Sequence, residues 1–126
     1  MQTVLLTDDN EYIVELVQLI LKNSGYMLLT ARDGVEAVDI CLKQKPDLVL
    51  MDLNMPNMNG FDATRTLRAK GFTNPIIALT ASESAEDRSK AEQAGVNDYI
   101  LKTMDMKEVE AKIDSFLQRG GPSINT

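Results

Sequence analysis

Four short apolar runs in this sequence each lead into a polar residue that can bind phosphate or metal. The runs and the residues that follow them are 4–7 with Asp8 and Asp9, 48–51 with Asp52, 76–79 with Thr80, and 99–101 with Lys102. Such runs, separated by helical patterns, are typical of buried parallel strands. Parallel strands end at the same edge of their sheet, and ligands bind at that edge in open α/β folds. The sequence therefore predicts a sheet edge that gathers three carboxylates, a hydroxyl and an ammonium group.

Segments with helical spacing of apolar residues lie between the strand-like runs. Strands are predicted at 3–7, 27–31, 47–52, 76–80 and 98–101, and helices near 11–23, 35–43, 61–69, 85–94 and 105–117. Alternating strands and helices imply right-handed crossovers and helices on both faces of the sheet. The most apolar strands are expected at the centre, which gives the strand order 2-1-3-4-5. The predicted fold class is a flavodoxin-like, doubly wound α/β fold with five parallel strands and five helices.

Local signals predict several helix ends and core faces. Asn10 is a predicted N-cap, Gly95 a predicted helix stop, and Asp105 with Glu108 a variant of the capping box. The residues expected to face the core from the second and fifth helices are Ala37, Val38, Cys41 and Leu42, and Met106, Val109, Ile113, Phe116 and Leu117. The fourth helix has alanines but no large apolar side chain, so we expect it to bury little area and to be weakly held.

Size and composition restrict the class of protein further. The 126 residues are enough for one domain with its own core. A net charge of −6 and the absence of His argue against a nucleic-acid surface, which needs clustered Lys and Arg. The single Cys41 excludes an internal disulfide and is expected to be a buried structural thiol. No apolar stretch reaches the ~20 residues of a membrane span and no export signal is visible, so we expect a cytoplasmic protein that binds neither a membrane nor, directly, nucleic acid.

The three carboxylates indicate a metal site. Carboxylates that lie close together repel one another, so they persist only with a cation or with raised pKa values. Oxygen donors without His or Cys favour a hard ion such as Mg²⁺. Lys102 and Thr80 suit a phosphoryl group, and Asp52, on a central strand, is the best candidate for a nucleophile that becomes an aspartyl phosphate. Each residue taken singly could be a helix cap, a strand end or a surface charge, but their occurrence at four strand ends favours a shared function.

Four segments of the chain resemble the receiver domains of response regulators. They are Asp8-Asp9-Asn10, Met51 to Gly60, Ala78-Leu79-Thr80-Ala81 and Asp98 to Lys102, within a likeness that extends over 3–117. We therefore expect a receiver domain in 1–118. Residues 119–126 lack apolar periodicity, so we expect them to form a mobile tail. The resemblance implies a signalling domain, not a turnover enzyme, that catalyses only its own phosphorylation and dephosphorylation. In that role Asp52 accepts a phosphoryl group from a phosphohistidine in a Mg²⁺-dependent reaction, and the domain then switches its output surface.

The resemblance also assigns roles to individual residues around Asp52. Mg²⁺ would be bound by Asp9, Asp52 and the backbone carbonyl of Asn54, with Asp8 assisting through water. The groups implied to contact the phosphoryl oxygens are the Lys102 ammonium, the Thr80 hydroxyl and the Ala81 backbone N–H.

Three further implications concern signalling. Tyr99 would be the switch aromatic that turns inward when Thr80 moves, although its position alone also fits a plain strand residue. Asn54 and Ser82 would tune hydrolysis of the acyl phosphate. The implied partner is a sensor histidine kinase or a histidine phosphotransfer protein. Receivers of hybrid kinases and phosphorelays are most similar to this sequence in three segments, 55–60, 61–65 and 78–81.

One position departs from the family pattern. Receivers usually carry Pro directly after the lysine, with a cis bond between the two, whereas Thr103 follows Lys102 here. A cis bond before a residue other than proline costs about 3–4 kcal/mol. We predict a trans Lys102–Thr103 bond and a rearranged loop, which puts the reach of Lys102 in question.

Three alternative functions are open at this point. A pseudo-receiver that binds partners without phosphorylation is disfavoured by the acidic residues with Thr80 and Lys102, but Thr103 leaves it open. A phosphohydrolase with an aspartyl nucleophile usually has its two acids two positions apart after the first strand, whereas Asp8 and Asp9 are adjacent. A flavodoxin-like carrier fits worst, because the acidic loop 8–11 would repel a flavin phosphate.

Overall fold

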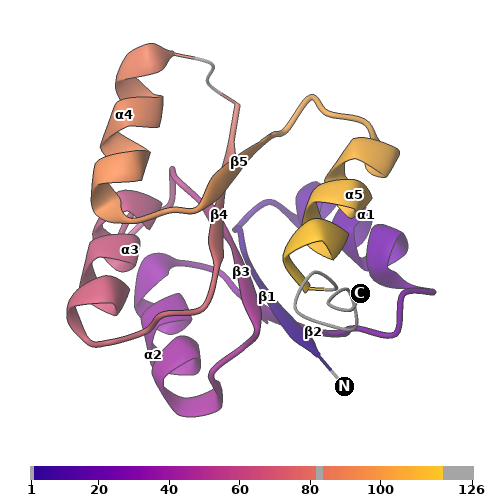
Figure 1. Ribbon diagram of the computed structural model, residues 1–126, viewed down its shortest axis with the longest axis horizontal. Helices are drawn as coiled ribbons and strands as arrows, with labels where there is room; N and C mark the ends of the chain where they lie inside the picture. The colour runs from indigo at the N-terminus through magenta and orange to yellow at the C-terminus, as the bar shows by residue number, and fades with distance from the viewer. Residues whose placement is uncertain (1, 82–83, 118–126) are drawn as a thin grey trace, which may run out of the picture.

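A five-stranded sheet flanked by helices makes up the protein. The computed structural model describes residues 2–81 and 84–117, so the tail predicted in 119–126 lies outside the described part of the chain. The elements in order are β1 (Thr3–Thr7), α1 (Glu11–Leu21), β2 (Met27–Ala31), α2 (Gly34–Gln44), β3 (Leu48–Asp52), α3 (Gly60–Ala69), β4 (Ile76–Thr80), α4 (Ala85–Ala94), β5 (Asp98–Leu101) and α5 (Met106–Leu117). Strands and helices alternate from one end to the other (Figure 1).

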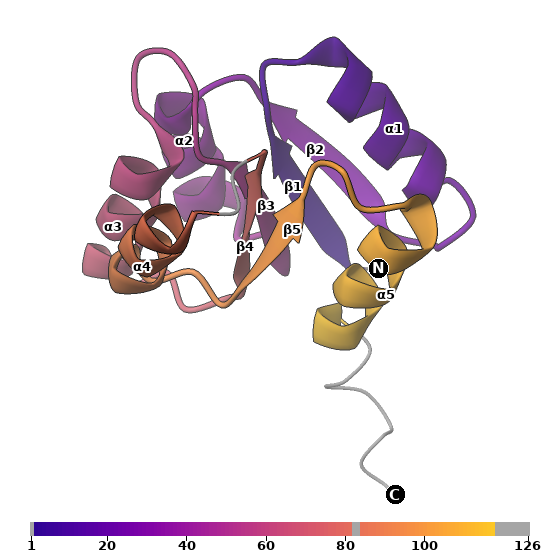
Figure 2. The ribbon, with the colours of Figure 1, turned by 90° about the horizontal axis from the view of Figure 1, so that it is seen from above.

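All strands of the sheet are parallel, in the order β2-β1-β3-β4-β5. The predicted fold class and strand order are therefore confirmed. α1 and α5 cover one face of the sheet, while α2, α3 and α4 lie on the other (Figure 2). At the carboxyl edge the register pairs Thr7 with Met51 and Thr80 with Leu101, so the residues that follow β1, β3, β4 and β5 emerge side by side.

Each face of the sheet has its own hydrophobic core. Alternate residues of β1 point to opposite faces, with Val4 and Leu6 in the core under α1 and α5 and Leu5 in the core under α2 and α3. Every residue of β3 and β4 is buried, as the nearly unbroken apolar runs predict for central strands. Cys41 is completely buried in the second core, so the structural thiol is confirmed.

The predicted helix ends are confirmed where a side chain or glycine sets them. The Asn10 side chain accepts a hydrogen bond from the Tyr12 N–H, and Gly95 ends α4 with a φ of +117°. Asp105 and Glu108 cap each other's backbone N–H at distances of 2.9 and 3.4 Å.

Two residues predicted to face the core are exposed instead. Leu42 is 38% exposed because the buried stripe of α2 runs through Ala37 and Cys41, and the next residue is turned about 100° away. Met106 is 41% exposed because the buried stripe of α5 is made by every fourth residue from Val109. One helical turn earlier that stripe reaches residue 105, not 106.

α4 buries only small apolar side chains and makes a cation–ring contact with α3. Its buried residues are Ala91 and Ala94, as the composition of this helix predicts. The Lys90 ammonium lies 4.6 Å from the centre of the Phe61 ring of α3. No helix in the described ranges is long and apolar enough to cross a membrane.

Candidate functional site

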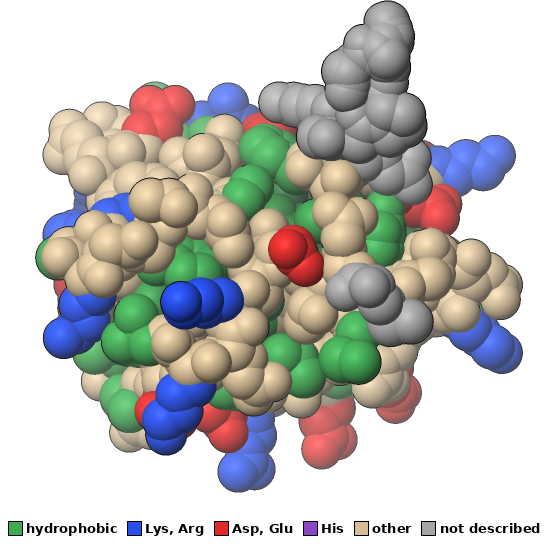
Figure 3. All heavy atoms as spheres, turned by 60° about the horizontal axis from the view of Figure 1, so that its bottom comes forward, with side chains coloured by type: hydrophobic (Ala, Val, Ile, Leu, Met, Phe, Trp, Pro, Cys, Tyr) green, Lys and Arg blue, Asp and Glu red, His purple; other side chains and the backbone are tan. Residues whose placement is uncertain are grey.

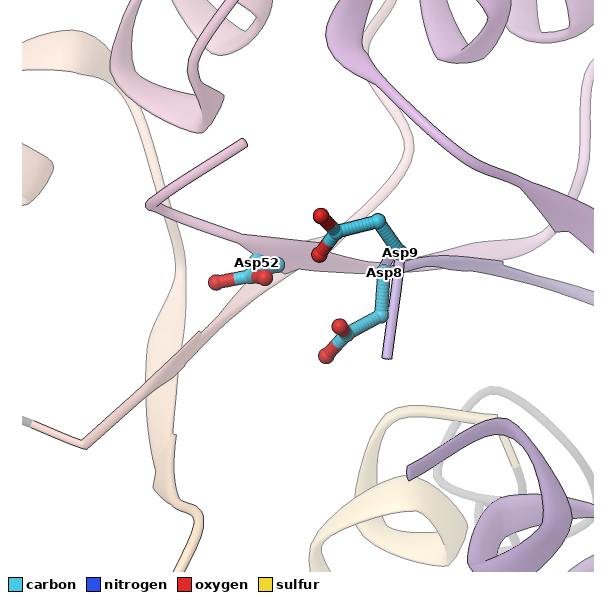
Figure 4. Close-up of side chains that lie close together, drawn as sticks. All are labelled: Asp8, Asp9 and Asp52. Carbon is cyan, nitrogen blue, oxygen red and sulfur yellow. The ribbon is translucent and has the colours of Figure 1, made fainter. Parts of the chain in front are cut away.

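Three carboxylates converge at the carboxyl ends of β1 and β3. Asp8 and Asp9 follow β1 and Asp52 ends β3, and each contributes an oxygen within 4.8 Å of the oxygens of the other two. The three side chains lie close together at the ends of the two strands (Figure 4). Asp8 and Asp52 are only 2% and 3% exposed, whereas Asp9 is open to solvent. The predicted acidic cluster thus exists, with one exposed and two buried members.

Lys102, the residue directly after β5, reaches this cluster. Its Nζ lies 3.1 Å from Asp8 Oδ2 and 3.3 Å from Asp52 Oδ2. The Lys102 backbone N–H donates to the Thr80 carbonyl at 2.9 Å, which fixes the start of the side chain. The described part of the chain contains no cis peptide bond, so the trans Lys102–Thr103 bond predicted from the sequence is confirmed. Lys102 therefore reaches the carboxylates without the usual proline.

Backbone N–H groups orient the two buried carboxylates. The Asn10 N–H donates to Asp8 Oδ1 at 2.9 Å, and the Asn54 N–H donates to Asp52 Oδ1 at 3.1 Å. Within the described residues, the buried Asp8 Oδ2 has no hydrogen bond in addition to its ion pair with Lys102. An oriented carboxylate with a free lone pair can bind a metal or a metal-bound water.

The electrostatics of the site are those of a cation-binding centre. Burial raises the pKa of Asp52 to about 6 and the charge of Asp8 adds to this effect, while the Asn54 N–H and Lys102 oppose it. Burial alone would lower the pKa of Lys102, but the charges of Asp52 and Asp8 outweigh burial and raise it. One ammonium group cannot balance three carboxylates, and all the donors are oxygens. This donor set fits Mg²⁺.

Of the predicted phosphoryl-responsive residues, Thr80 and Ala81 lie at the same edge of the sheet, whereas Tyr99 lies two residues before the end of β5, beside Ala78. Thr80 ends β4 and is buried, and Ala81 follows it. Tyr99, on β5, is 8% exposed, and its hydroxyl donates to the Arg88 carbonyl of α4 at 2.5 Å. Its ring is therefore already turned inward. Ser82 lies outside the described residues.

Two residues near the site were missed by the sequence analysis. A Cβ on Gly60 would lie 2.2 Å from the Asp52 backbone oxygen, so this position accepts only glycine without a shift of the chain. Gly60 belongs to the Met51 to Gly60 segment that resembles receiver domains, which was a usable signal for its place beside Asp52. The Arg88 guanidinium lies 4.6 Å from the centre of the Tyr99 ring. This contact joins residues that are 11 positions apart in the sequence, so no local sequence pattern predicts it.

Comparison with known proteins identifies a family whose predicted site residues are those found at this acidic cluster. The family model of the response regulator receiver domain matches residues 4–114. The probable transcriptional regulatory protein TcrX of Mycobacterium tuberculosis is 35% identical over 119 residues, which are 94% of this chain and 51% of TcrX. The chain spans about half the length of the curated relatives it matches.

Solved structures of similar sequence share the whole fold. The receiver domain of the sensor histidine kinase PA1611 from Pseudomonas aeruginosa, solved with a magnesium ion in its active site cleft, is 36% identical with a TM-score of 0.84. The match covers 92% of this chain and 97% of that one. The chemotaxis protein CheY4 of Vibrio cholerae is 29% identical with a TM-score of 0.85, over 92% and 98% of the two chains.

These matches confirm the function predicted from the sequence, a signalling receiver that is phosphorylated on an aspartate with Mg²⁺. The chain belongs to the response regulator receiver domain family of two-component signalling.

Proposed function

We propose that Asp52 is the phosphoacceptor of this receiver. The observation that carries this assignment is the position of Asp52 at the end of a central strand, buried, between Asp8 and Lys102. A carboxylate oxygen of Asp52 attacks the phosphorus of a phosphohistidine. The new O–P bond forms as the N–P bond breaks, and the released imidazole takes up a proton.

Asp9, Asp52 and the backbone carbonyl of Asn54 would hold Mg²⁺, and Asp8 would act through water. When bound, Mg²⁺ neutralises charge that builds up on the phosphoryl oxygens. Lys102, which pairs with Asp8 and Asp52 in the resting protein, would turn its ammonium group to pair with the phosphoryl oxygens. Lys102 would thus balance the charge of the Asp8 and Asp52 carboxylates before the reaction and the charge of the phosphoryl group after it.

Phosphorylation would be sensed through the next two strands. The Thr80 hydroxyl and the Ala81 N–H would donate to the phosphoryl oxygens, and the resulting movement of Thr80 would change the packing of Tyr99, whose ring already faces inward. Because Tyr99 contacts α4 through Arg88, this coupling changes the surface that includes α4 and β5. Asn54 and Ser82 would tune hydrolysis of the acyl phosphate, as the family resemblance implies.

The phosphoryl donor is proposed to be a sensor histidine kinase or a histidine phosphotransfer protein. Tyr12 and Leu19 on α1 are 72% and 57% exposed, which offers such a partner an apolar surface on the helix that follows the acidic loop.

Incubation with acetyl phosphate tests the proposal. With Mg²⁺, the intact mass of the wild-type protein should increase by one phosphoryl group, and this gain should disappear when Mg²⁺ is chelated. Asp52→Asn should show no gain under either condition. Equal phosphorylation of wild type and Asp52→Asn would refute the assignment of Asp52.

A further inference from the structure

The loop between β3 and α3, residues 53–59, carries one of the proposed Mg²⁺ ligands and is fixed at its base. The Asn54 N–H donates to Asp52 Oδ1 at 3.1 Å, and the Gly60 N–H donates to the Leu53 carbonyl at 3.2 Å. The carbonyl of Asn54, which is proposed to bind the metal, therefore lies where the loop leaves this base. Its direction depends on the path of the rest of the loop.

The tip of this loop contains a tight, strained turn. The Met58 N–H donates to the Pro56 carbonyl at 2.7 Å, which closes a three-residue turn around Asn57. Asn57 has a φ of +66°, a conformation that costs free energy for any residue other than glycine and less for asparagine than for most. A strained turn at a loop tip persists when contacts from outside the loop hold it.

Those contacts come from the start of α2. Asn57 Nδ2 donates to Asp33 Oδ2 at 2.7 Å, and the Gly34 N–H donates to the Met58 carbonyl at 3.0 Å. The other Asp33 oxygen accepts from the Glu36 N–H at 2.9 Å, so the carboxylate is fixed by the helix it caps. Asn57 and Met58 are thus hydrogen-bonded to the consecutive residues Asp33 and Gly34 at the start of α2.

The approach of the two loops is as close as backbone atoms allow. A Cβ on Gly34 would lie 2.5 Å from the Met58 carbonyl oxygen. Met55 and Met58 also pack against the core under α2 and α3. The Asp33–Asn57 hydrogen bond lies at the exposed end of this contact, so its loss frees the loop tip without emptying the core.

We propose that Asp33 and Asn57 are positioning residues for the phosphorylation site. They act on Mg²⁺ binding by holding the 53–59 loop, although neither touches the acidic cluster. The proposal rests on the proposed function, because it takes the Asn54 carbonyl as a metal ligand. It adds the requirement that Asp33, at the end of the β2–α2 loop, holds Asn57 by a hydrogen bond, a contact that we call the brace.

Two substitutions remove the brace and keep the local structure. Asn57→Gly removes the amide and relieves the positive φ, and Asp33→Ser keeps an N-cap for α2 but lacks the second oxygen. Gln93→Ala is a matched control, since it removes an exposed amide that contacts Ser89 within α4. Mg²⁺ dissociation constants are measured by calorimetry on the full chain, and phosphorylation rates with acetyl phosphate at limiting and saturating Mg²⁺.

We expect each brace variant to weaken Mg²⁺ binding about three- to tenfold, the effect of one hydrogen bond that orients a ligand. The variant with both substitutions should bind Mg²⁺ as tightly as the single variant that binds it less tightly, because both substitutions remove the same contact. Phosphorylation should slow at limiting Mg²⁺ and recover at saturation, and the ¹⁵N–¹H resonance of Asn54 should shift while those of α5 stay in place.

Unchanged Mg²⁺ affinity in both variants, with normal binding by the wild type, would overturn the brace and leave the proposed function intact. Absence of Mg²⁺ binding by the wild type would overturn both. A loss of stability with unchanged affinity and an unmoved Asn54 resonance would show a purely structural contact and would also overturn the proposal.

Discussion

Gly60 is the residue where packing leaves the least room beside Asp52. A Cβ there would lie 2.2 Å from the Asp52 carbonyl oxygen and 2.9 Å from the Leu53 Cα, backbone atoms that no side-chain rotation can move. Alanine is the better helix former by about 1 kcal/mol, so an ordinary helical site would gain stability from the exchange. Here we predict that Gly60→Ala lowers the free energy of unfolding by about 1–3 kcal/mol, because the chain around Asp52 must shift.

Urea unfolding measures this difference. Arg65→Ala, at an exposed position of the same helix, should change stability by less than about 0.5 kcal/mol and serves as the control. Equal or higher stability of Gly60→Ala would contradict the close approach of α3 to Asp52.

Asp52 itself lowers the stability of the metal-free protein at neutral pH. Its pKa of about 6 in the folded protein lies above the ordinary value of 3.8, so the folded state binds more protons than the unfolded state between these pH values. Protonated Asp52 therefore adds its full contribution to the free energy of unfolding below about pH 4, and this contribution is lost as the pH rises through about 6. We predict that Asp52→Asn is more stable than wild type by about 1–3 kcal/mol at pH 7, and that the difference shrinks toward pH 4.

Urea unfolding of both proteins at pH 4 and pH 7, with a chelator present, measures the difference in their free energies of unfolding and its direction. A variant less stable than wild type at pH 7 would mean that the ion pair with Lys102 outweighs the burial of Asp52 and its repulsion by Asp8.

At the scale of elements, α4 differs from the other helices in how it is held. Its buried residues are two alanines, whereas α3 and α5 bury larger side chains such as Phe61, Leu67 and Ile113. Small buried area implies a low free energy of local opening. α4 is also the helix that Tyr99 contacts, so the helix next to the proposed switch is one with little buried apolar area.

We predict that the amides of α4 exchange with solvent faster than those of α3 and α5. Arg88→Ala should speed exchange in α4 by a further two- to fivefold, about the effect of losing an exposed cation–π contact with Tyr99. Hydrogen exchange followed by NMR reports each helix separately, with Arg65→Ala as the control. Protection of α4 equal to that of α5 would be incompatible with weak attachment.

At the scale of the whole molecule, the sheet topology was predictable because it follows from local patterns. Apolar runs ending in Asp8, Asp52, Thr80 and Lys102 indicated both the strands and the edge where their side chains meet. The brace between Asp33 and Asn57 could not be predicted in this way, because it depends on the distance between two loops that only the folded chain defines. The exposed Leu42 and Met106 were mispredicted because helical spacing alone does not fix the exact orientation of a helix on the sheet.

Metal binding should stabilise the folded protein as a whole. Mg²⁺ at ten times its dissociation constant should raise the free energy of unfolding by about 1.4 kcal/mol, since the unfolded chain has no assembled site. Thermal unfolding with increasing Mg²⁺ measures the effect. Asp52→Asn, which lacks one proposed ligand, should respond much less, and an equal response in both proteins would place the ion elsewhere.

The identity of the phosphorylated residue is the central claim, and chemical trapping tests it most directly. Borohydride reduces an aspartyl phosphate to homoserine, which peptide mass spectrometry locates in the sequence. After treatment with acetyl phosphate and Mg²⁺, we predict homoserine at position 52 and unmodified Asp8 and Asp9. Homoserine at position 8 or 9, or at no position, would contradict the account.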